Sequence, residues 1–232
     1  MAVGRTTHLT RDEIVATALA LLDENGGDFS MRALASRLKV SPAALYHHFD
    51  NQRDLVTAVV GKVWEEAIEE YLAAAQDPFG QGSDPTEMLV TGAICGRRAF
   101  NRHPRVAPYM AVAPGIDTRL SGGLAIFGSL MERFGLEGPA AGEAMYAYST
   151  YVLGNILYTA QRRLNAERLG EPNALHGFSS VGARPADAPV PTGATTAAID
   201  RAIAVTGTDA EEELFVAGLL GLLRGLLSTA GV

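Results

Sequence analysis

Two serines that each precede a short segment with the apolar spacing of a helix constrain the fold of this chain most strongly. Ser30 precedes one such segment, and Ser41, followed by Pro42, precedes a second. Serine is a preferred helix N-cap, and proline is tolerated at the first helical position because its missing N–H would have no intrahelical partner. The spacing therefore predicts helices over about 31–38 and 42–49, joined by a tight turn.

A third helix is predicted ahead of these two. Thr10 and Glu13 stand three residues apart at its start, which is the capping-box pattern, and Gly26 with Gly27 ends it. Three short helices in so little chain, the last two joined by a tight turn, indicate a helix-turn-helix unit. The apolar residues on one face of the first helix are Ile14, Ala18, Leu21 and Leu22.

The remaining apolar segments also have helical rather than alternating spacing. We therefore expect an all-α protein with a three-helix head, residues 1–55, and a larger helical body, residues 56–232. Residues 170–197 are rich in Gly, Pro and Ala, which is typical of a loop. Further helices are expected at about 53–75, 85–103, 107–113, 117–135, 139–168, 196–206 and 209–229.

Cysteine content and charge limit the class of protein. The chain has a single cysteine, Cys95, which excludes an intrachain disulfide framework and a Cys-rich zinc site. Residues 1–62 contain seven Lys or Arg and seven Asp or Glu, so the formal charge of −7 lies in residues 63–232. With no long apolar run at the N-terminus, we expect a cytoplasmic protein.

The helix predicted over about 42–49 carries polar rings on the face opposite its apolar pair. Leu45 and Phe49 are four residues apart, so they share a face that we expect to point inward. Small residues on the other face let a helix approach the DNA major groove, where a phenol and an imidazole can contact base edges and phosphates. The outward face holds Pro42, Ala43, Tyr46 and His47.

The adjacent histidines, His47 and His48, allow two other interpretations. Neighbouring side chains on a helix point about 100° apart, which does not suit a pair of metal ligands, so we expect no metal here. His48 lies nearer the apolar face and is expected either to face outward or to pack partly against another helix.

The stretch MRALASRLKVSPAALYHHFDNQRDLV resembles the N-terminal signature of TetR-type (tetracycline repressor) transcriptional regulators. The resemblance covers about residues 10–58, and segments 151–158 and 214–226 look like the two dimer-forming helices of the tetracycline repressor branch. The matching positions are Leu34, Ala35, Leu38, Val40, Ser41, Leu45, Tyr46, His48, Phe49, Asn51 and Leu55.

The resemblance implies a homodimer that binds a palindromic operator in double-stranded DNA and is released when a small molecule binds the body. Two positions depart from the family pattern: Lys39 stands at a turn position that is usually Gly, and Gln52 stands where a phosphate-contacting Lys is usual. The implied DNA-contacting residues are Arg32, Ser41, Pro42, Ala43, Ala44, Tyr46, His47, His48, Gln52 and Arg53.

The ligand implied by the resemblance is not a metal chelate. Ile68, Met110 and Tyr158 stand where the tetracycline repressor has a polar His and two metal-coordinating residues, and none of the three can hold Mg²⁺ as a carboxylate or imidazole would. No cofactor is expected. Aromatic residues of the body suit a flat, largely hydrophobic molecule, although the same residues also suit plain core packing. The candidate ligand-binding residues are Trp64, Phe100, Tyr109, Met110, Phe127, Met131, Tyr151, Asn155 and Tyr158.

A basic cluster over residues 97–105 suits either an anionic ligand or the dipole of a helix C-terminus. The segment 214–232 is 19 residues long with one charge, Arg224, which is near the lower limit for a membrane span. Its mid-run charge and its glycines favour a helix that packs against its own copy in a homodimer, with no membrane contact.

Enzymes form the main alternative class. The segment GFSSVG has Val181 where a nucleophile elbow requires Gly, and the sequence has no P-loop, dinucleotide fingerprint or HExxH motif. We therefore expect no enzymatic activity. A DNA-binding regulator or architectural protein without a small-molecule effector stays open as the second interpretation.

Overall fold

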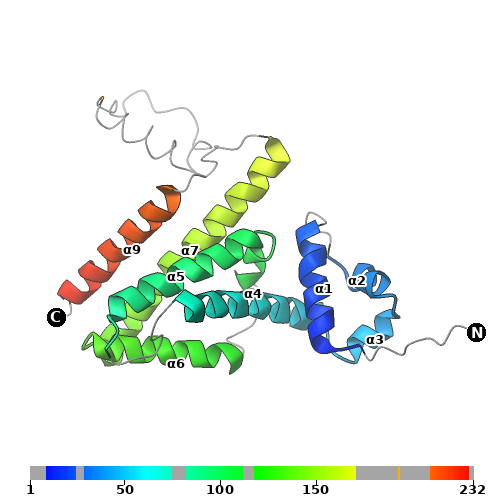
Figure 1. Ribbon diagram of the computed structural model, residues 1–232, viewed down its shortest axis with the longest axis horizontal. Helices are drawn as coiled ribbons and strands as arrows, with labels where there is room; N and C mark the ends of the chain where they lie inside the picture. Colours follow the sequence, from blue (N-terminus) through cyan, green and yellow to red (C-terminus); the bar gives the residue numbers. More distant parts are fainter. Residues whose placement is uncertain are drawn as a thin grey trace, which may run out of the picture.

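The computed structural model describes residues 9–24, 29–74, 82–111, 118–170, 193 and 210–229, without the side chains of 111 and 118–125. Every regular element within these residues is a helix, which confirms the all-α prediction (Figure 1). The elements are α1 Arg11–Glu24, α2 Met31–Leu38, α3 Pro42–Tyr46, α4 Gln52–Ala74, α5 Pro85–Arg102, a 3-10 helix η1 Ala107–Ala111, α6 Thr118–Arg133, α7 Gly138–Leu169 and α9 Ala210–Thr229.

The caps that begin the head helices form as predicted. Glu13 N–H donates to the Thr10 hydroxyl at 3.2 Å, and Thr10 N–H donates to the Glu13 carboxylate at 3.0 Å, which completes the capping box. The Ser30 hydroxyl accepts from Ala33 N–H at 3.1 Å, and the Ser41 hydroxyl accepts from Ala44 N–H at 3.3 Å. The starts of all three helices are thus specified by adjacent residues.

The turn between α2 and α3 depends on Lys39. Its φ of 56° and ψ of 39° lie in the left-handed region, where a Cβ costs energy and glycine is favoured. Lys39 N–H bonds to Ser36 O at 3.2 Å and Val40 N–H bonds to Ala35 O at 3.0 Å, which is the Schellman pattern that ends a helix. The strain expected from a non-glycine residue at this turn is present.

Two predicted helices differ in the structure. Helix α3 ends at Tyr46 and not near Phe49 as predicted. The N–H groups of His48 and Phe49 both bond to Leu45 O, and the chain turns there. The segment predicted at 107–113 is the 3-10 helix η1; Tyr109 N–H bonds to Val106 O, three residues back. The predicted helix at 196–206, the Gly26–Gly27 stop and nearly all of the 170–197 loop lie outside the described residues.

Helix α4 joins the head to the body. Helices α1, α2 and α3 lie together at one end of the molecule, and α4 runs from them into the body beside α5 (Figure 1). Helix α5 packs against α7, α6 and α9, and α7 packs against α9. Any displacement of α4 therefore involves both the head and the body.

Apolar burial follows the predicted faces. Ile14, Leu34, Leu45 and Phe49 are each at most 1% exposed in the head, and each such side chain contributes roughly 1.5–3 kcal/mol relative to exposure. Leu38 is half-buried against the same core. In the part of the chain that the structure describes, no helix combines the length and apolar character that a membrane crossing requires.

Candidate functional site

The outward face of α3 is open to solvent. Tyr46 is 51% exposed, and His47, Pro42 and Ala43 are also exposed, while Leu45 on the opposite face is fully buried. This is the orientation that the i, i+4 spacing predicts. A phenol and an imidazole stand beside two small residues, on a helix short enough to be carried into a groove by the rest of the head.

Arg11 of α1 holds the chain behind this face. Its Nη1 donates to His48 O at 2.6 Å, its guanidinium lies 4.0 Å from the centre of the Phe49 ring, and its Nη2 lies 3.5 Å from Asp54 of α4. A partly exposed ion pair adds little stability, so the main effect of Arg11 is to orient α3. Sequence reasoning missed Arg11, since its partners lie 37 and 43 residues away.

The other predicted DNA-contacting residues fall into two groups. Arg32 on α2 and Arg53 at the start of α4 are exposed, as a contact with phosphate requires. Ala44 and His48 are half-buried, and two polar side chains already bond to the protein: the Ser41 hydroxyl caps α3, and Gln52 Nε2 donates to Phe29 O at 3.1 Å. Arg32, Arg53 and the outward face of α3 are therefore the stronger candidates for DNA contact, since Ser41 and Gln52, although exposed, already bond within the protein.

A cavity of about 210 Å³ lies between α4, α5, α6 and α7. Carbon atoms dominate its wall, which suits a hydrophobic ligand. Helix α4 contributes residues at positions 64, 67, 68 and 71, the i, i+3, i+4, i+7 spacing of one helical face. The lining residues are Trp64, Ala67, Ile68, Tyr71, Met88, Leu89, Gly92, Ile126, Phe127, Leu130 and Tyr148.

The cavity wall is aromatic and uncharged. The rings of Phe127 and Tyr148 lie 4.6 Å apart between centres, and Tyr148 donates its hydroxyl hydrogen to Leu89 O at 2.8 Å. Burial raises the pKa of Tyr148 and also that of Tyr71, which is less buried. Both phenols are therefore neutral at physiological pH. Such a wall accommodates a flat, uncharged ring system better than an ion.

The structure brings few of the nine predicted ligand-binding residues together. Trp64 and Phe127 line the cavity. Phe100 is fully buried with its ring 5.0 Å from that of Trp64, and Met131 is 1% exposed in the core. The rest lie elsewhere: Tyr109 and Met110 half-buried in η1, Tyr151 stacked on Phe215, Asn155 bonded to Arg97, and Tyr158 41% exposed.

Of the three positions considered for a metal chelate, only Ile68 lines the cavity. Met110 lies in η1 and Tyr158 is on the surface of α7. Among the described residues no group of three or more His, Cys, Asp or Glu side chains could hold a metal ion.

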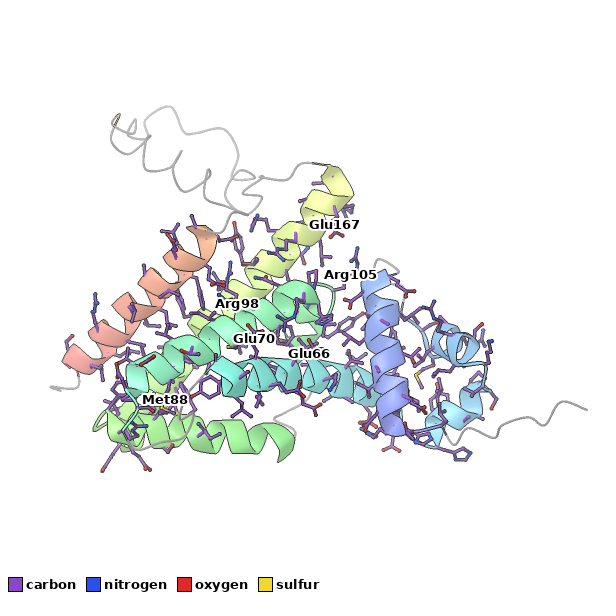
Figure 2. All side chains as sticks on the ribbon, in the orientation of Figure 1. Glu66, Glu70, Met88, Arg98, Arg105 and Glu167 are labelled. Carbon is purple, nitrogen blue, oxygen red and sulfur yellow. The ribbon has the colours of Figure 1, made fainter. Side chains whose placement is uncertain are left out.

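Polar side-chain contacts link both ends of α1 to α4. Near its start, Arg11 meets Asp54; near its end, Asp23 lies 2.7 Å from His103 Nδ1, while His103 Nε2 lies 3.1 Å from Glu66 of α4. Figure 2 labels Glu66 on α4. His103 follows directly after α5, so one imidazole joins three helices. These contacts connect α1, which holds the chain behind the α3 face, to α4.

Comparisons with known proteins agree with this arrangement. A family model described as bacterial regulatory proteins, tetR family, matches residues 14–59. An HTH-type transcriptional regulator of Saccharopolyspora erythraea is 27% identical over 230 residues, 97% of this chain and 87% of the relative.

Two solved structures are also similar. The Streptomyces coelicolor TetR family protein ActR, in complex with actinorhodin, is 26% identical with a TM-score of 0.70, covering 97% of this chain and 99% of ActR. BioQ with its double-stranded DNA operator is 25% identical with a TM-score of 0.57, covering 70% of this chain and 93% of BioQ. The head thus matches the model of the tetR family of bacterial regulatory proteins, and the chain shares the fold of a TetR family protein along nearly its whole length.

Proposed function

We propose that this regulator is a repressor that leaves its operator when a small, mainly hydrophobic or aromatic molecule binds the body. The observation that carries the proposal is the double role of α4. One half of this helix lines the cavity with Trp64, Ala67, Ile68 and Tyr71, and the helix is tied to α1 of the head through Asp54 and Glu66. A ligand that shifts α4 changes the position of the head.

The similar structures support both halves of this proposal. The ActR structure contains bound actinorhodin, and the BioQ structure contains its DNA operator. We assign DNA binding to residues 1–55 and ligand binding with dimerisation to residues 56–232. The proposed DNA contacts are made by Arg32, Pro42, Ala43, Tyr46, His47 and Arg53, with Ser41, Ala44, His48 and Gln52 beside them.

We further propose that the protein acts as a homodimer through α7 and α9. Only one stripe of α9, Phe215, Leu219 and Leu223, is buried within the protomer, while Leu214 remains 51% exposed. Gly221 is exposed with no neighbour near the position of a Cβ, so another helix can approach closely. A two-fold copy of the same surface would cover these apolar groups, and a dimer matches a palindromic operator.

The test uses ligand-induced release from DNA. An operator selected from random duplexes is bound to the protein, and a panel of aromatic metabolites and antibiotics is screened for release by fluorescence anisotropy. Gly92 lines the cavity with free space around it, so Gly92→Leu fills the cavity without reaching the head. We expect this variant to bind DNA normally and to need at least about tenfold more ligand for release, since lost contacts of about 1.4 kcal/mol change affinity tenfold.

Gly142→Leu is the matched control, because Gly142 is exposed on α7 and also has free space. It should release DNA as the unaltered protein does. The competing function, a DNA-binding regulator or architectural protein without an effector, predicts that no compound in the panel changes operator affinity. Release that is equally sensitive in both variants would exclude this cavity as the effector site.

A further inference from the structure

A second cavity, of about 530 Å³, lies outside the apolar one, between the end of α1, the end of α5 and the last part of α7. Four of its nine lining residues are arginines: Arg102, Arg105, Arg162 and Arg163. Figure 2 shows Arg105 and Glu167 in this region, where α7 comes near α1. None of its lining residues belongs to the wall of the apolar cavity.

The charges of the cavity wall are not balanced locally. Two lining residues, Asp23 and Glu167, are acidic, against the four arginines. Arg105 bonds to Glu167 at 2.6 Å, and Arg102 and Arg162 bond to glutamates behind the wall at 2.9 and 2.8 Å. Arg163 donates to Asn101 O at 2.8 Å and, among the described residues, has no carboxylate within ion-pair distance.

A further arginine, Arg97, is buried behind the wall and lies 3.7 Å from both Glu211 and Glu212. Burial lowers the pKa of Arg97 most; Glu211 and Glu212 raise it, and Arg163 and Arg162 lower it. Arginine forks of this kind bind carboxylate or phosphate oxygens through paired N–H groups. A small anion in the cavity would give Arg163 a charged partner.

Several polar atoms of the wall lack a partner. Arg162 is 5% exposed, and its Nε, the Nε of Arg105 and the Oδ1 of Asp23 are buried with no hydrogen bond. Native proteins leave few buried polar atoms unpaired, so each such atom requires an explanation. Two N–H donors suit an anion, and a carboxylate oxygen suits a hydroxyl group of the same ligand.

We propose that this cavity binds a small anion that also carries hydroxyl groups, of the hydroxycarboxylate or sugar-phosphate class, with Arg163 as its main charged contact. The ligand would lie against α1 through Asp23 and against the body through Arg105 and Arg163. The site is separate from the apolar cavity, so its occupant differs in chemistry from the proposed effector.

The experiment is isothermal titration calorimetry on the full chain without DNA, with citrate, glucose 6-phosphate, inorganic phosphate and glucose as probes. Citrate and glucose 6-phosphate represent the two ligand classes. We expect at least one of them to bind at one site per chain, inorganic phosphate to bind more weakly because it lacks the alcohol groups, and glucose not to bind. Without DNA in the cell, the result does not depend on the proposed operator binding.

Two variants test the assignment to Arg163. Arg163→Gln removes the charge and keeps an amide donor for Asn101 O, and should weaken binding at least about tenfold, as expected for a lost charge-assisted hydrogen bond. Arg163→Lys keeps the charge without the fork and should weaken binding less, so it decides the matter if the glutamine variant does not fold. Arg168→Gln removes an exposed charge five residues along the same helix, outside the cavity, and should have no effect.

Three results would overturn the proposal: no binding of either organic anion at millimolar concentration, binding of glucose as tight as that of glucose 6-phosphate, or equal affinity in the Arg163 variants and the Arg168→Gln control.

Discussion

The outward face of α3 and the apolar cavity are both surfaces that meet another molecule, yet they are built in opposite ways. The α3 face comes from one stretch of chain, and its caps and its turn at Lys39 lie within that stretch. The cavity takes side chains from four helices, from Trp64 to Tyr148 along the chain. A recognition surface on a local motif can therefore be located from spacing, whereas a cavity depends on how distant helices pack.

The largest expected effect concerns the support of α3 and not its exposed face. Phe49→Ala removes a ring that is 1% exposed and that lies against Arg11, and should lower the free energy of unfolding by about 3–5 kcal/mol. Chemical denaturation measures this loss. Tyr46→Ala, which removes an exposed ring at the end of α3, is the control and should change stability by less than about 0.5 kcal/mol. Equal losses would mean that the buried ring behind α3 supports the head no more than the exposed ring does.

The exposed face should matter for DNA alone. Tyr46→Ala and His47→Ala should each weaken operator binding by about 1–3 kcal/mol while the melting temperature stays unchanged. Fluorescence anisotropy with the selected operator measures the loss. Tyr146→Ala removes a tyrosine that is 75% exposed on α7, far along the chain, and should leave affinity unchanged. Unaltered affinity in both head variants would break the assignment of α3 as the DNA-reading helix.

The link between the two regions should depend on His103. His103→Ala breaks the contacts with Asp23 and Glu66, so ligand and operator should each still bind while the free energy that couples them falls by about 1 kcal/mol. The measurement is operator affinity with and without saturating ligand. Arg37→Ala breaks an exposed ion pair with Glu24 inside the head and should leave the coupling intact. Coupling that is the same in both variants would place the link elsewhere.

The smallest effect is a gain in stability at the turn. Lys39→Gly relieves the left-handed strain and should stabilise the head by about 1 kcal/mol without changing operator affinity. Lys62→Gly, in the regular helix α4, should instead destabilise by about 1 kcal/mol. Thermal unfolding distinguishes the two signs, and destabilisation in both variants would show that the side chain of Lys39 contributes more than its backbone costs.

Much of the head could be predicted because its determinants are local. The capping box of Thr10 and Glu13, the serine caps and the shared buried face of Leu45 and Phe49 all follow from spacings of three or four residues. The point at which α3 ends was predicted wrongly, since the turn after Tyr46 is stabilised from outside by Arg11. That contact joins residues far apart in sequence and leaves no periodic signal.

The cavity could be predicted only in part. Trp64 and Phe127 line it. Phe100 and Met131 are also large and apolar, but they are buried in the core and do not line the cavity. Tyr151 was selected for its ring, and that ring packs on Phe215 of α9. Residue type marks an apolar interior, but the division between cavity wall and solid core is decided by which helices leave space between them.

From its own amino-acid order this chain determined an all-helical fold, a capped helix-turn-helix head and the direction in which Tyr46 and His47 point, because hydrogen bonds and apolar periodicity over three or four residues specify them. Only the tertiary structure decided which side chains enclose the apolar cavity, how His103 joins α1 to α4, and that arginines from α5 and α7 surround a second cavity. Those features arise where separate helices meet, and the distances between them are set by packing and not by sequence spacing.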